Sequence, residues 1–298
     1  MDLLQLQYFR TAAREGNFTR AADKLLVSQP ALSKMIKNLE DELGAKLFDR
    51  RGRNIYLNES GKIMLFYADR ILSAVEDAKK EISDKKQSLK GHCTFSMTAA
   101  TRLLPEIVVR FKELYPQTDI ICTQESHSSP QPTNDLYIYS SRQEEENAVT
   151  LLREECVLCV PEDHFLAGRS SLTAEEKAML RDENFLVIQN KMPTYQLTEE
   201  LCREGGFKPH IALECDSSET IFSLIEAHMG VAVLPFVTWR KSIISRRAGI
   251  VRIGEDFCRY ILLREREGRY ATKAAENFRD FVIAYFKQIE RNESLLKR

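Results

Sequence analysis

The 298-residue sequence has no long apolar run. No N-terminal segment has the length of a signal peptide, and no stretch approaches the ~20 apolar residues that cross a bilayer. We therefore expect a cytoplasmic protein with no membrane partner. The seven cysteines are odd in number and scattered, which is typical of reduced, buried thiols rather than of a disulfide framework.

The motifs of several enzyme classes are missing as well. The chain has no G-x-S-x-G, no H-E-x-x-H, no G-x-G-x-x-G after a strand and no G-x-x-x-x-G-K-[ST]. Cys156 and Cys159 lie within one apolar run without a second pair at zinc spacing, so we interpret them as core thiols. Only Cys202, beside Arg203, has a context that could lower its pKa. The sequence thus predicts a protein that is not an enzyme and has no metal or cofactor.

Charge is nearly balanced over the whole chain, with a formal net charge of -1, but it is unevenly distributed. Residues 1–58 hold ten lysines and arginines against seven aspartates and glutamates, so the remainder is acidic. A basic N-terminal segment followed by a mildly acidic remainder is typical of a DNA-binding module attached to another domain.

The most informative segment is 18–40, FTRAADKLLVSQPALSKMIKNLE, which has apolar residues at helical spacing in two short stretches. Ser28 is placed to cap the second helix, and Pro30 falls within its first turn, where a missing N–H does no harm. Polar and basic side chains then share the outer face of that helix, as contacts to base edges and phosphates require. The pattern predicts a helix-turn-helix, braced by a helix over 3–14, and double-stranded DNA as its partner.

Each candidate DNA contact has an expected role. The residues expected at base edges are Gln29, Ser33 and Lys34, and those expected at the DNA backbone are Ser28, Pro30 and Lys37. Short strands at 46–48 and 55–57 around the turn Arg51-Gly52-Arg53 predict a basic β-hairpin wing. Within the wing, Arg53 is favoured for a minor groove and Arg50 for a phosphate, with Arg51 as a third candidate. The alternative is a solvated helix face and a solubilising wing.

Residues 58–86 form one long helical pattern. Its apolar positions step by four and three along Met64, Ala68, Ile71, Val75, Ala78 and Ile82. Such a seam predicts pairing with the same helix of a second copy. The alternative is an amphipathic helix that lies on its own domain.

From residue 91 onward, apolar strand-like runs alternate with helical stretches, which predicts an α/β domain with βαβ units and mainly parallel sheets. The last 35 residues are expected to pack as a helix on the first sheet. Thr98 and Thr101 precede a helix expected to open at about Arg102, where hydroxyls and free N–H groups suit an organic anion. Other effector-site candidates lie where strands should end, namely Ser140, Gln189 and Thr194. For Thr101 the alternative is simple capping.

This pattern resembles the LysR-type family of bacterial transcriptional regulators. The specific part of the match comprises Phe9, Ala12, Phe18, Thr19, Ala21, Ala22, Leu25, the run Ser28-Gln29-Pro30-Ala31-Leu32-Ser33, Ile36, Leu39-Glu40, Leu43-Gly44, Leu47-Phe48, Arg50, Leu57 and Gly61. A weaker part comprises Leu104-Pro105, Tyr115-Pro116, Asp135, Pro161-x-x-His164 and the run Gly230 to Pro235.

The resemblance implies three parts: a winged helix-turn-helix (1–58), a linker helix that dimerises (59–90) and an effector domain (91–298). That domain is expected to have two lobes, as periplasmic solute-binding proteins do, joined by two crossover strands. Lobe one would comprise 91–160 and 264–298, and lobe two 161–263. The implied function is a transcriptional regulator that binds dyad-symmetric operators as a dimer or tetramer. A small effector in the cleft and RNA polymerase are its further expected partners.

One segment departs from the family pattern. Residues 117–134 are about ten residues shorter than in most members, and the helix expected there is missing. Two alternatives therefore stand beside the main interpretation. One is a regulator whose ligand-free effector domain acts through protein contacts, and the other is a solute-binding protein whose N-terminal module only mediates assembly.

Overall fold

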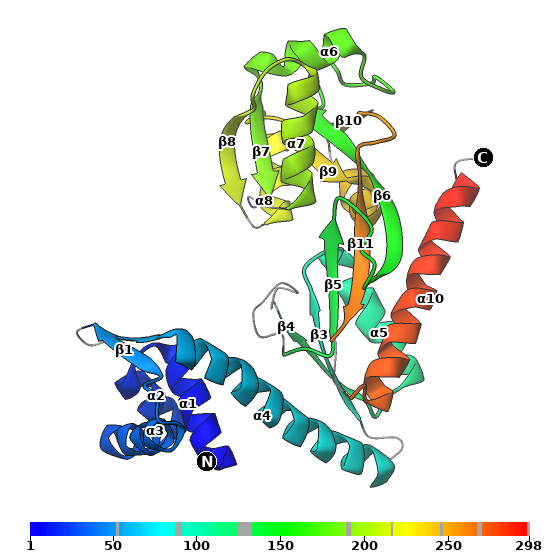
Figure 1. The fold of residues 1–298 in the computed structure, drawn as a ribbon. Helices are drawn as coiled ribbons and strands as arrows, with labels where there is room; N and C mark the ends of the chain where they lie inside the picture. Colours follow the sequence, from blue (N-terminus) through cyan, green and yellow to red (C-terminus); the bar gives the residue numbers. More distant parts are fainter. Residues whose placement is uncertain are drawn as a thin grey trace. The chain divides into compact units, whose positions relative to one another are not determined.

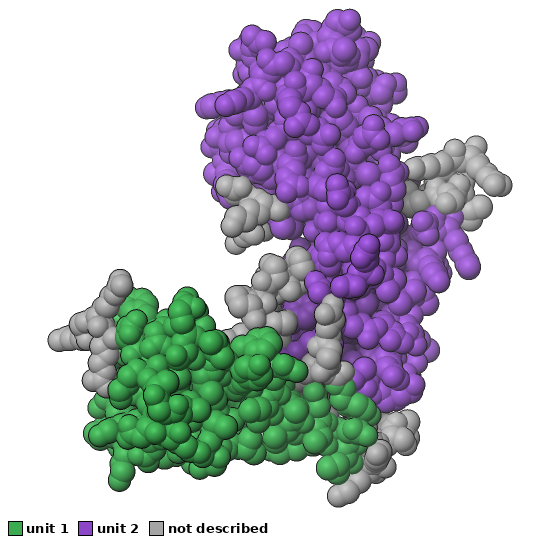
Figure 2. Space-filling view, viewed as in Figure 1, with its two compact units in different colours: residues 1–88, 268–270 green, residues 89–267, 271–298 purple. Residues whose placement is uncertain are grey.

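The computed structural model describes residues 1–51, 54–86, 91–123, 133–188, 192–215, 217–244, 247–266 and 270–296. The chain falls into two compact units, Met1–Ser88 with Gly268–Tyr270 and Leu89–Glu267 with Ala271–Arg298 (Figures 1 and 2). Each unit is described by itself below. Among the helices of the described ranges, none combines the length and apolarity needed to cross a membrane.

The first unit begins with three helices, α1 (Leu3–Glu15), α2 (Phe18–Leu25) and α3 (Gln29–Leu43). Asn17 caps α2, because its side chain accepts hydrogen bonds from two backbone N–H groups of the first turn. Ser28 caps α3 as predicted, with Oγ 3.4 Å from the backbone nitrogen of Ala31. The predicted helix-turn-helix is therefore present, with both helix starts fixed by local hydrogen bonds.

The wing is a hairpin of β1 (Phe48–Arg51) and β2 (Asn54–Leu57), paired antiparallel. It begins two residues later than the predicted strand at 46–48. The carboxylate of Glu40 accepts hydrogen bonds from Lys46 Nζ at 2.8 Å and Leu47 N at 2.9 Å, which holds that segment outside the ladder. Arg51, predicted in the turn, is instead the last residue of β1.

The helix α4 (Glu59–Lys86) follows the wing and is ~42 Å long at 1.5 Å per residue. Met64, Ala68 and Leu72 are buried in the core of the first unit, where α4 packs on α1. The predicted seam therefore divides: its first two positions face the helix's own domain. Ile71 and Ile82 are exposed, so only the later part of the seam is open to a second copy.

Gly61 explains how closely α4 approaches the wing. A Cβ atom added at this glycine would lie 2.1 Å from the carbonyl oxygen of Leu47 and 2.8 Å from the side chain of Leu57. Asn58 caps the helix start, because its Oδ1 accepts from Gly61 N at 2.9 Å while its Nδ2 donates to the carbonyl of Lys46. Helix and wing therefore form one packed unit.

The second unit has two lobes (Figure 1). Elements of the first lobe are β3 (His92–Met97), η1 (Thr101–Leu103), α5 (Leu104–Leu114), β4 (Asp119–Thr123), β5 (Leu136–Ser141) and α10 (Lys273–Leu296). Elements of the second lobe are α6 (Ala174–Met179), η2 (Leu180–Asp182), β7 (Asn184–Ile188), α7 (Pro193–Glu204), β8 (His210–Cys215), α8 (Ser218–Glu226), β9 (Ala232–Pro235), α9 (Phe236–Ile244) and β10 (Ala248–Arg252). The strands β6 (Val149–Pro161) and β11 (Cys258–Glu265) connect them.

Sheet topology is more mixed than predicted. Strand β3 pairs parallel with β4 and β5, and β7 pairs parallel with β8, as βαβ units require. Both connecting strands pair antiparallel, however: β11 lies between β5 and β6, and β6 also pairs with β9 and β10. The prediction of mainly parallel sheets was wrong for these strands, because they carry the chain from one lobe to the other in opposite directions.

The side chains of β6 and β11 divide between two hydrophobic cores. Leu152 and Ile261 belong to the first-lobe core, whereas Cys156 and Phe257, the residue just before β11, belong to the second-lobe core. We therefore propose lobe boundaries within 153–155 and 258–260, a few residues before those expected at 160/161 and 263/264.

Helix α10 packs on the first sheet, as predicted for the end of the chain. Phe278, Val282 and Phe286 are fully buried there, and the ring centres of Phe278 and Phe95 are 4.5 Å apart. Residues up to Glu265 still belong to β11, and the helix begins at Lys273, where Oγ1 of Thr272 accepts a hydrogen bond from Ala275 N. Within the shortened segment, β4 occupies Asp119–Thr123, and residues 124–132 lie outside the described part of the chain.

Candidate nucleic-acid interface and effector cleft

The outer face of α3 is presented to solvent. Leu32, Ile36 and Leu39 on the inner face are buried in the core of the first unit. The exposed candidates for DNA contact on or next to this helix are Ser28, Gln29, Pro30, Lys34 and Lys37, with Ser33 half-buried. The helix therefore offers the predicted set of side chains on one side.

Gln29 and Ser33 lie one helical turn apart and are linked directly. Nε2 of Gln29 donates a hydrogen bond of 2.8 Å to Oγ of Ser33. The amide oxygen, the second amide hydrogen and the serine hydroxyl hydrogen are left for a nucleic acid. Because each side chain restricts the other, the pair presents donors and an acceptor with a defined spacing.

Lys34 and Lys37 take part in no ion pair within the described residues, unlike several other cations of the first unit. Lys24, for instance, is 2.7 Å from a carboxylate oxygen of Glu15. An ammonium group without an internal carboxylate partner is suited to a phosphate. In the wing, the backbone places Arg50 opposite Ile55, whereas the third predicted contact, Arg53, lies outside the described residues.

Two of the predicted effector-site residues lie at the ends of neighbouring strands, and a third lies in the other lobe. Met97 pairs with Ile138, so Thr98 and Ser140 both lie at the carboxyl end of the parallel pair β3–β5. The Oγ atom of Ser140 is buried and has no hydrogen-bond partner in the described part of the chain. Thr194 is buried in the first turn of α7, in the second lobe. The fifth candidate, Gln189, falls outside the described residues.

The predicted helix start at Thr101 needs correction. Thr101 is the first residue of the 3₁₀ turn η1 and is exposed, and α5 begins only at Leu104. Neither helix has a side-chain cap, since the preceding residues are Ala100 and Leu103. The capping alternative for Thr101 was therefore wrong. Ala100 has φ +56°, a left-handed conformation that is strained for a residue with a Cβ.

Comparison with known proteins agrees with this architecture. Residues 3–62 match the family described as "Bacterial regulatory helix-turn-helix protein, lysR family", and residues 87–287 match "LysR substrate binding domain". The chain belongs to the LysR family. It is a transcriptional regulator with a helix-turn-helix DNA-binding module and an effector-binding domain, and it is not an enzyme.

Similar proteins of this family span the whole chain. The uncharacterized regulator YybE of Bacillus subtilis is 30% identical and is covered over its full length by 97% of this chain. A full-length OxyR variant from Pseudomonas aeruginosa has the same fold with a TM-score of 0.69, 24% identity and coverage of 95% and 94%. CbnR, solved in complex with its target DNA, gives a TM-score of 0.62 at 21% identity, with 95% and 99% covered. The predicted winged helix-turn-helix, linker helix and two-lobed domain are thus confirmed as the fold.

Two arginines that were not predicted as site residues connect the lobes of this LysR-family protein. Arg102 follows Thr101 directly, and its Nη2 lies 2.5 Å from Oε1 of Glu219 in α8. Arg142 follows β5, and its Nη2 lies 2.8 Å from Oε2 of Glu200 in α7. The partners are 117 and 58 residues apart, so no local sequence pattern pointed to either pair.

A buried ion pair lies where the crossover strands pass between the lobes. Glu154 and Arg259 are opposite each other on β6 and β11, with 2.9 Å between Oε2 and Nε. The second carboxylate oxygen accepts a hydrogen bond from the backbone N–H of Thr238 at 2.5 Å, and Nη2 of Arg259 donates to Oγ1 of Thr238. The network thus fixes α9 of the second lobe to both strands.

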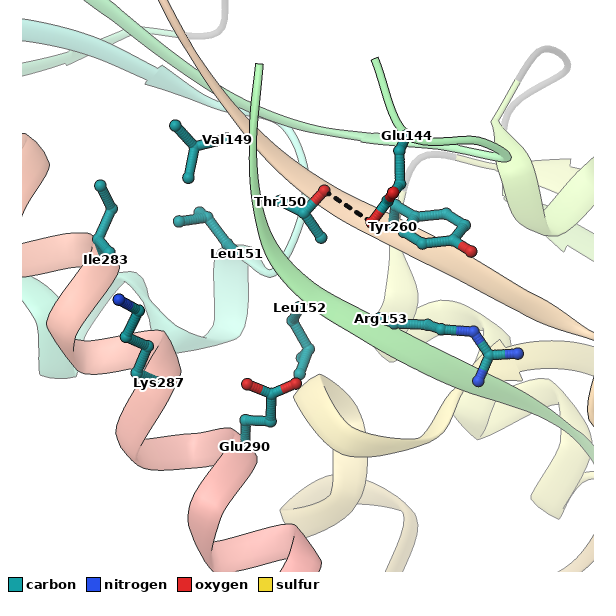
Figure 3. Close-up of a pocket in the computed structure, with 10 residues that line it drawn as sticks. All are labelled: Glu144, Val149, Thr150, Leu151, Leu152, Arg153, Tyr260, Ile283, Lys287 and Glu290. Atoms are coloured by element: carbon teal, nitrogen blue, oxygen red, sulfur yellow. Dashed lines mark hydrogen bonds between the residues drawn. The ribbon is translucent and has the colours of Figure 1, made fainter. Parts of the chain in front are cut away.

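A separate cavity of about 330 Å³ lies in the first lobe between β6 and α10 (Figure 3). Its lining residues are Glu144, Val149, Thr150, Leu151, Leu152, Arg153, Tyr260, Ile283, Lys287 and Glu290. Oγ1 of Thr150 donates a hydrogen bond of 3.2 Å to Glu144 at its rim. None of the four predicted effector residues in the described part of the chain lines this cavity.

Cys156, Cys159 and Cys202 lie in environments that disfavour thiolates. Cys156 and Cys159 are fully buried, and burial raises the pKa of the Cys159 thiol to about 12. Burial likewise raises the pKa of Cys202 to about 12, so the expectation that Arg203 could lower it was wrong. In the described ranges, no group of three His, Cys, Asp or Glu side chains is arranged to hold a metal ion.

Proposed function

We propose that this regulator binds dyad-symmetric operator DNA as a dimer or tetramer, with α3 in the major groove. The exposed face of α3 carries this proposal, because Gln29 and Ser33 form a preorganised pair beside two lysines that have no carboxylate partner among the described residues. Ser28 and Pro30 at the helix start, with Arg50, Arg51 and Arg53 of the wing, would contact the DNA backbone and an adjacent minor groove. CbnR, a structural relative, was solved with its target DNA. The cytoplasm is the compartment in which this activity would be exercised.

A randomised-site selection with the full-length protein tests the proposal. We expect enriched sequences with two half-sites related by dyad symmetry and separated by about one helical turn. Retention on random duplex DNA at low salt, lost steeply as salt rises, would accompany it. The proposal would be contradicted if the protein enriched no sequence, or if it bound no duplex DNA at any salt concentration.

We further propose that a small organic anion binds between the lobes and changes the DNA contacts. The hydroxyls of Thr98 and Thr101 make no hydrogen bond within the described residues, and Oγ of Ser140 is buried without a partner. Such hydroxyls at the carboxyl ends of parallel strands are suited to a ligand, with Gln189 and Thr194 as further contacts. RNA polymerase would be the partner through which transcription responds.

A thermal-shift screen of small organic acids separates this proposal from a ligand-free effector domain. A ligand present at a hundred times its Kd stabilises the folded state by about 2.7 kcal/mol, which is readily measured. An absence of any shift across the acids, together with intact DNA binding, would favour a domain that acts through protein contacts. Ligand binding without DNA binding would instead indicate a solute-binding protein.

A further inference from the structure

We propose that Arg102 is the anion-binding residue of the cleft and that Glu219 occupies it as an internal competitor. On this basis the effector is a small carboxylic acid that displaces Glu219. The inference rests on the proposed effector function and specifies its ligand class and the contact through which that ligand would act on the lobes.

Glu219, Phe222 and Trp239 of the second lobe are among the groups that hold the guanidinium of Arg102. Oε1 of Glu219 is 2.5 Å from Nη2, and the guanidinium carbon lies 5.3 Å from the ring centre of Trp239 and 5.7 Å from that of Phe222. Aromatic faces attract a guanidinium and leave its in-plane N–H groups directed at a carboxylate. The rings therefore position Arg102 to receive an anion.

The two members of the ion pair differ in how readily they can exchange partners. The Arg102 side chain is 20% exposed, whereas the Glu219 side chain is 58% exposed in the first turn of α8. An exposed carboxylate that leaves an arginine is rehydrated at small cost, and such pairs contribute little net stability. The carboxylate is thus the exchangeable partner, and the arginine is the fixed one.

The surroundings of Arg102 favour a ligand carboxylate as the replacement. Arg102 follows Thr101 directly on η1, and the hydroxyls of Thr101 and Thr98 make no hydrogen bond in the described residues. A planar guanidinium recognises a carboxylate through two parallel N–H donors, and hydroxyls on the same segment of chain are suited to a polar group beside that carboxylate. Because Glu219 belongs to the opposite lobe, ligand binding would break a contact between the lobes. Binding and lobe arrangement would then be coupled in both directions.

Trp239 provides the measurement, since it is the only tryptophan in the chain and lies beside the guanidinium. The full-length protein would be titrated with sodium acetate, succinate, lactate and benzoate at constant ionic strength, with Trp239 emission as the readout. Glu219→Gln removes the competing charge, so we expect half-saturation at a two- to fivefold lower acid concentration than in the wild type, the range that an exposed ion pair supports. Arg102→Gln should abolish the response.

Glu204→Gln is the matched control. It removes a carboxylate that lies 2.7 Å from Lys177 within the second lobe, without touching Arg102, and should titrate as the wild type does. If Glu219→Gln responds to none of the acids, or no more strongly than Glu204→Gln, the competitor role is wrong. An acid that stabilises the wild type and Arg102→Gln equally would overturn the Arg102 assignment while leaving the proposed effector function intact.

Discussion

Nε2 of Gln29 and Oγ of Ser33 are joined by a hydrogen bond of 2.8 Å across one turn of the exposed face of α3. The bond uses one of the two amide hydrogens of Gln29, and the amide oxygen stays available. Whatever base this pair contacts would meet two side chains that act together.

Gln29→Ala should relax the preference for one base pair in each half-site without abolishing DNA binding. A bidentate amide contact contributes about 1–3 kcal/mol of discrimination between bases. The selectivity for the preferred base should therefore fall roughly five- to 150-fold. The measurement is a randomised-site selection on both proteins. Asn38→Ala, exposed on the same helix, should leave the selected sequence unchanged. An unaltered base preference in Gln29→Ala would show that Gln29 does not read bases.

Lys37→Gln should weaken binding to all sequences equally. Removing one phosphate contact reduces the slope of log affinity against log salt by about one, with base preference retained. Fluorescence anisotropy over a range of salt concentrations measures the slope. Lys24→Gln is the control, since its ammonium is already paired with Glu15. Equal slopes for Lys37→Gln and the wild type would remove Lys37 from the interface.

Gly61→Ala should destabilise the first unit by about 1–3 kcal/mol, because the new methyl group would overlap the carbonyl of Leu47. Urea unfolding followed by far-ultraviolet circular dichroism measures the change. Ser60→Ala, at the exposed neighbouring position, should stay within about 0.5 kcal/mol of the wild type. A neutral Gly61→Ala would mean that α4 and the wing are not tightly packed in solution.

Ala100→Gly should stabilise the second unit by about 1 kcal/mol, since a left-handed conformation is strained for alanine and not for glycine. Thermal unfolding monitored by Trp239 reports on this unit. Ala99 has no positive φ, so Ala99→Gly should destabilise instead, through greater freedom of the unfolded chain. Two glycine variants with effects of the same sign would argue against strain at Ala100.

Glu154→Gln should destabilise the second unit by about 3 kcal/mol, because it leaves the buried guanidinium of Arg259 without a countercharge. Chemical denaturation measures the loss. The neighbouring Glu155 faces Arg252 at 3.6 Å in a more exposed pair, so Glu155→Gln should cost less than about 1 kcal/mol. Similar losses of unfolding free energy in both variants would mean that the burial of Glu154 does not determine its contribution to stability.

The sequence determined the DNA-binding module in some detail. Its helix starts are fixed by hydrogen bonds between near neighbours, such as Ser28 to Ala31. The exposed side of α3 follows from helical spacing alone, because Leu32, Ile36 and Leu39 must be buried together. The order of strands and helices after residue 91 was predictable for the same local reason.

Tertiary structure decided the features that depend on distant partners. The seam of α4 divides because its first part packs on α1, which no periodicity could reveal. Antiparallel pairing of β6 and β11 reflects how the chain passes twice between the lobes. The pairs Arg102–Glu219 and Glu154–Arg259 join residues 117 and 105 positions apart. Residue spacing along the chain encodes which face of a helix or strand is apolar. Only the packed fold determines which distant charged side chains become ion-pair partners.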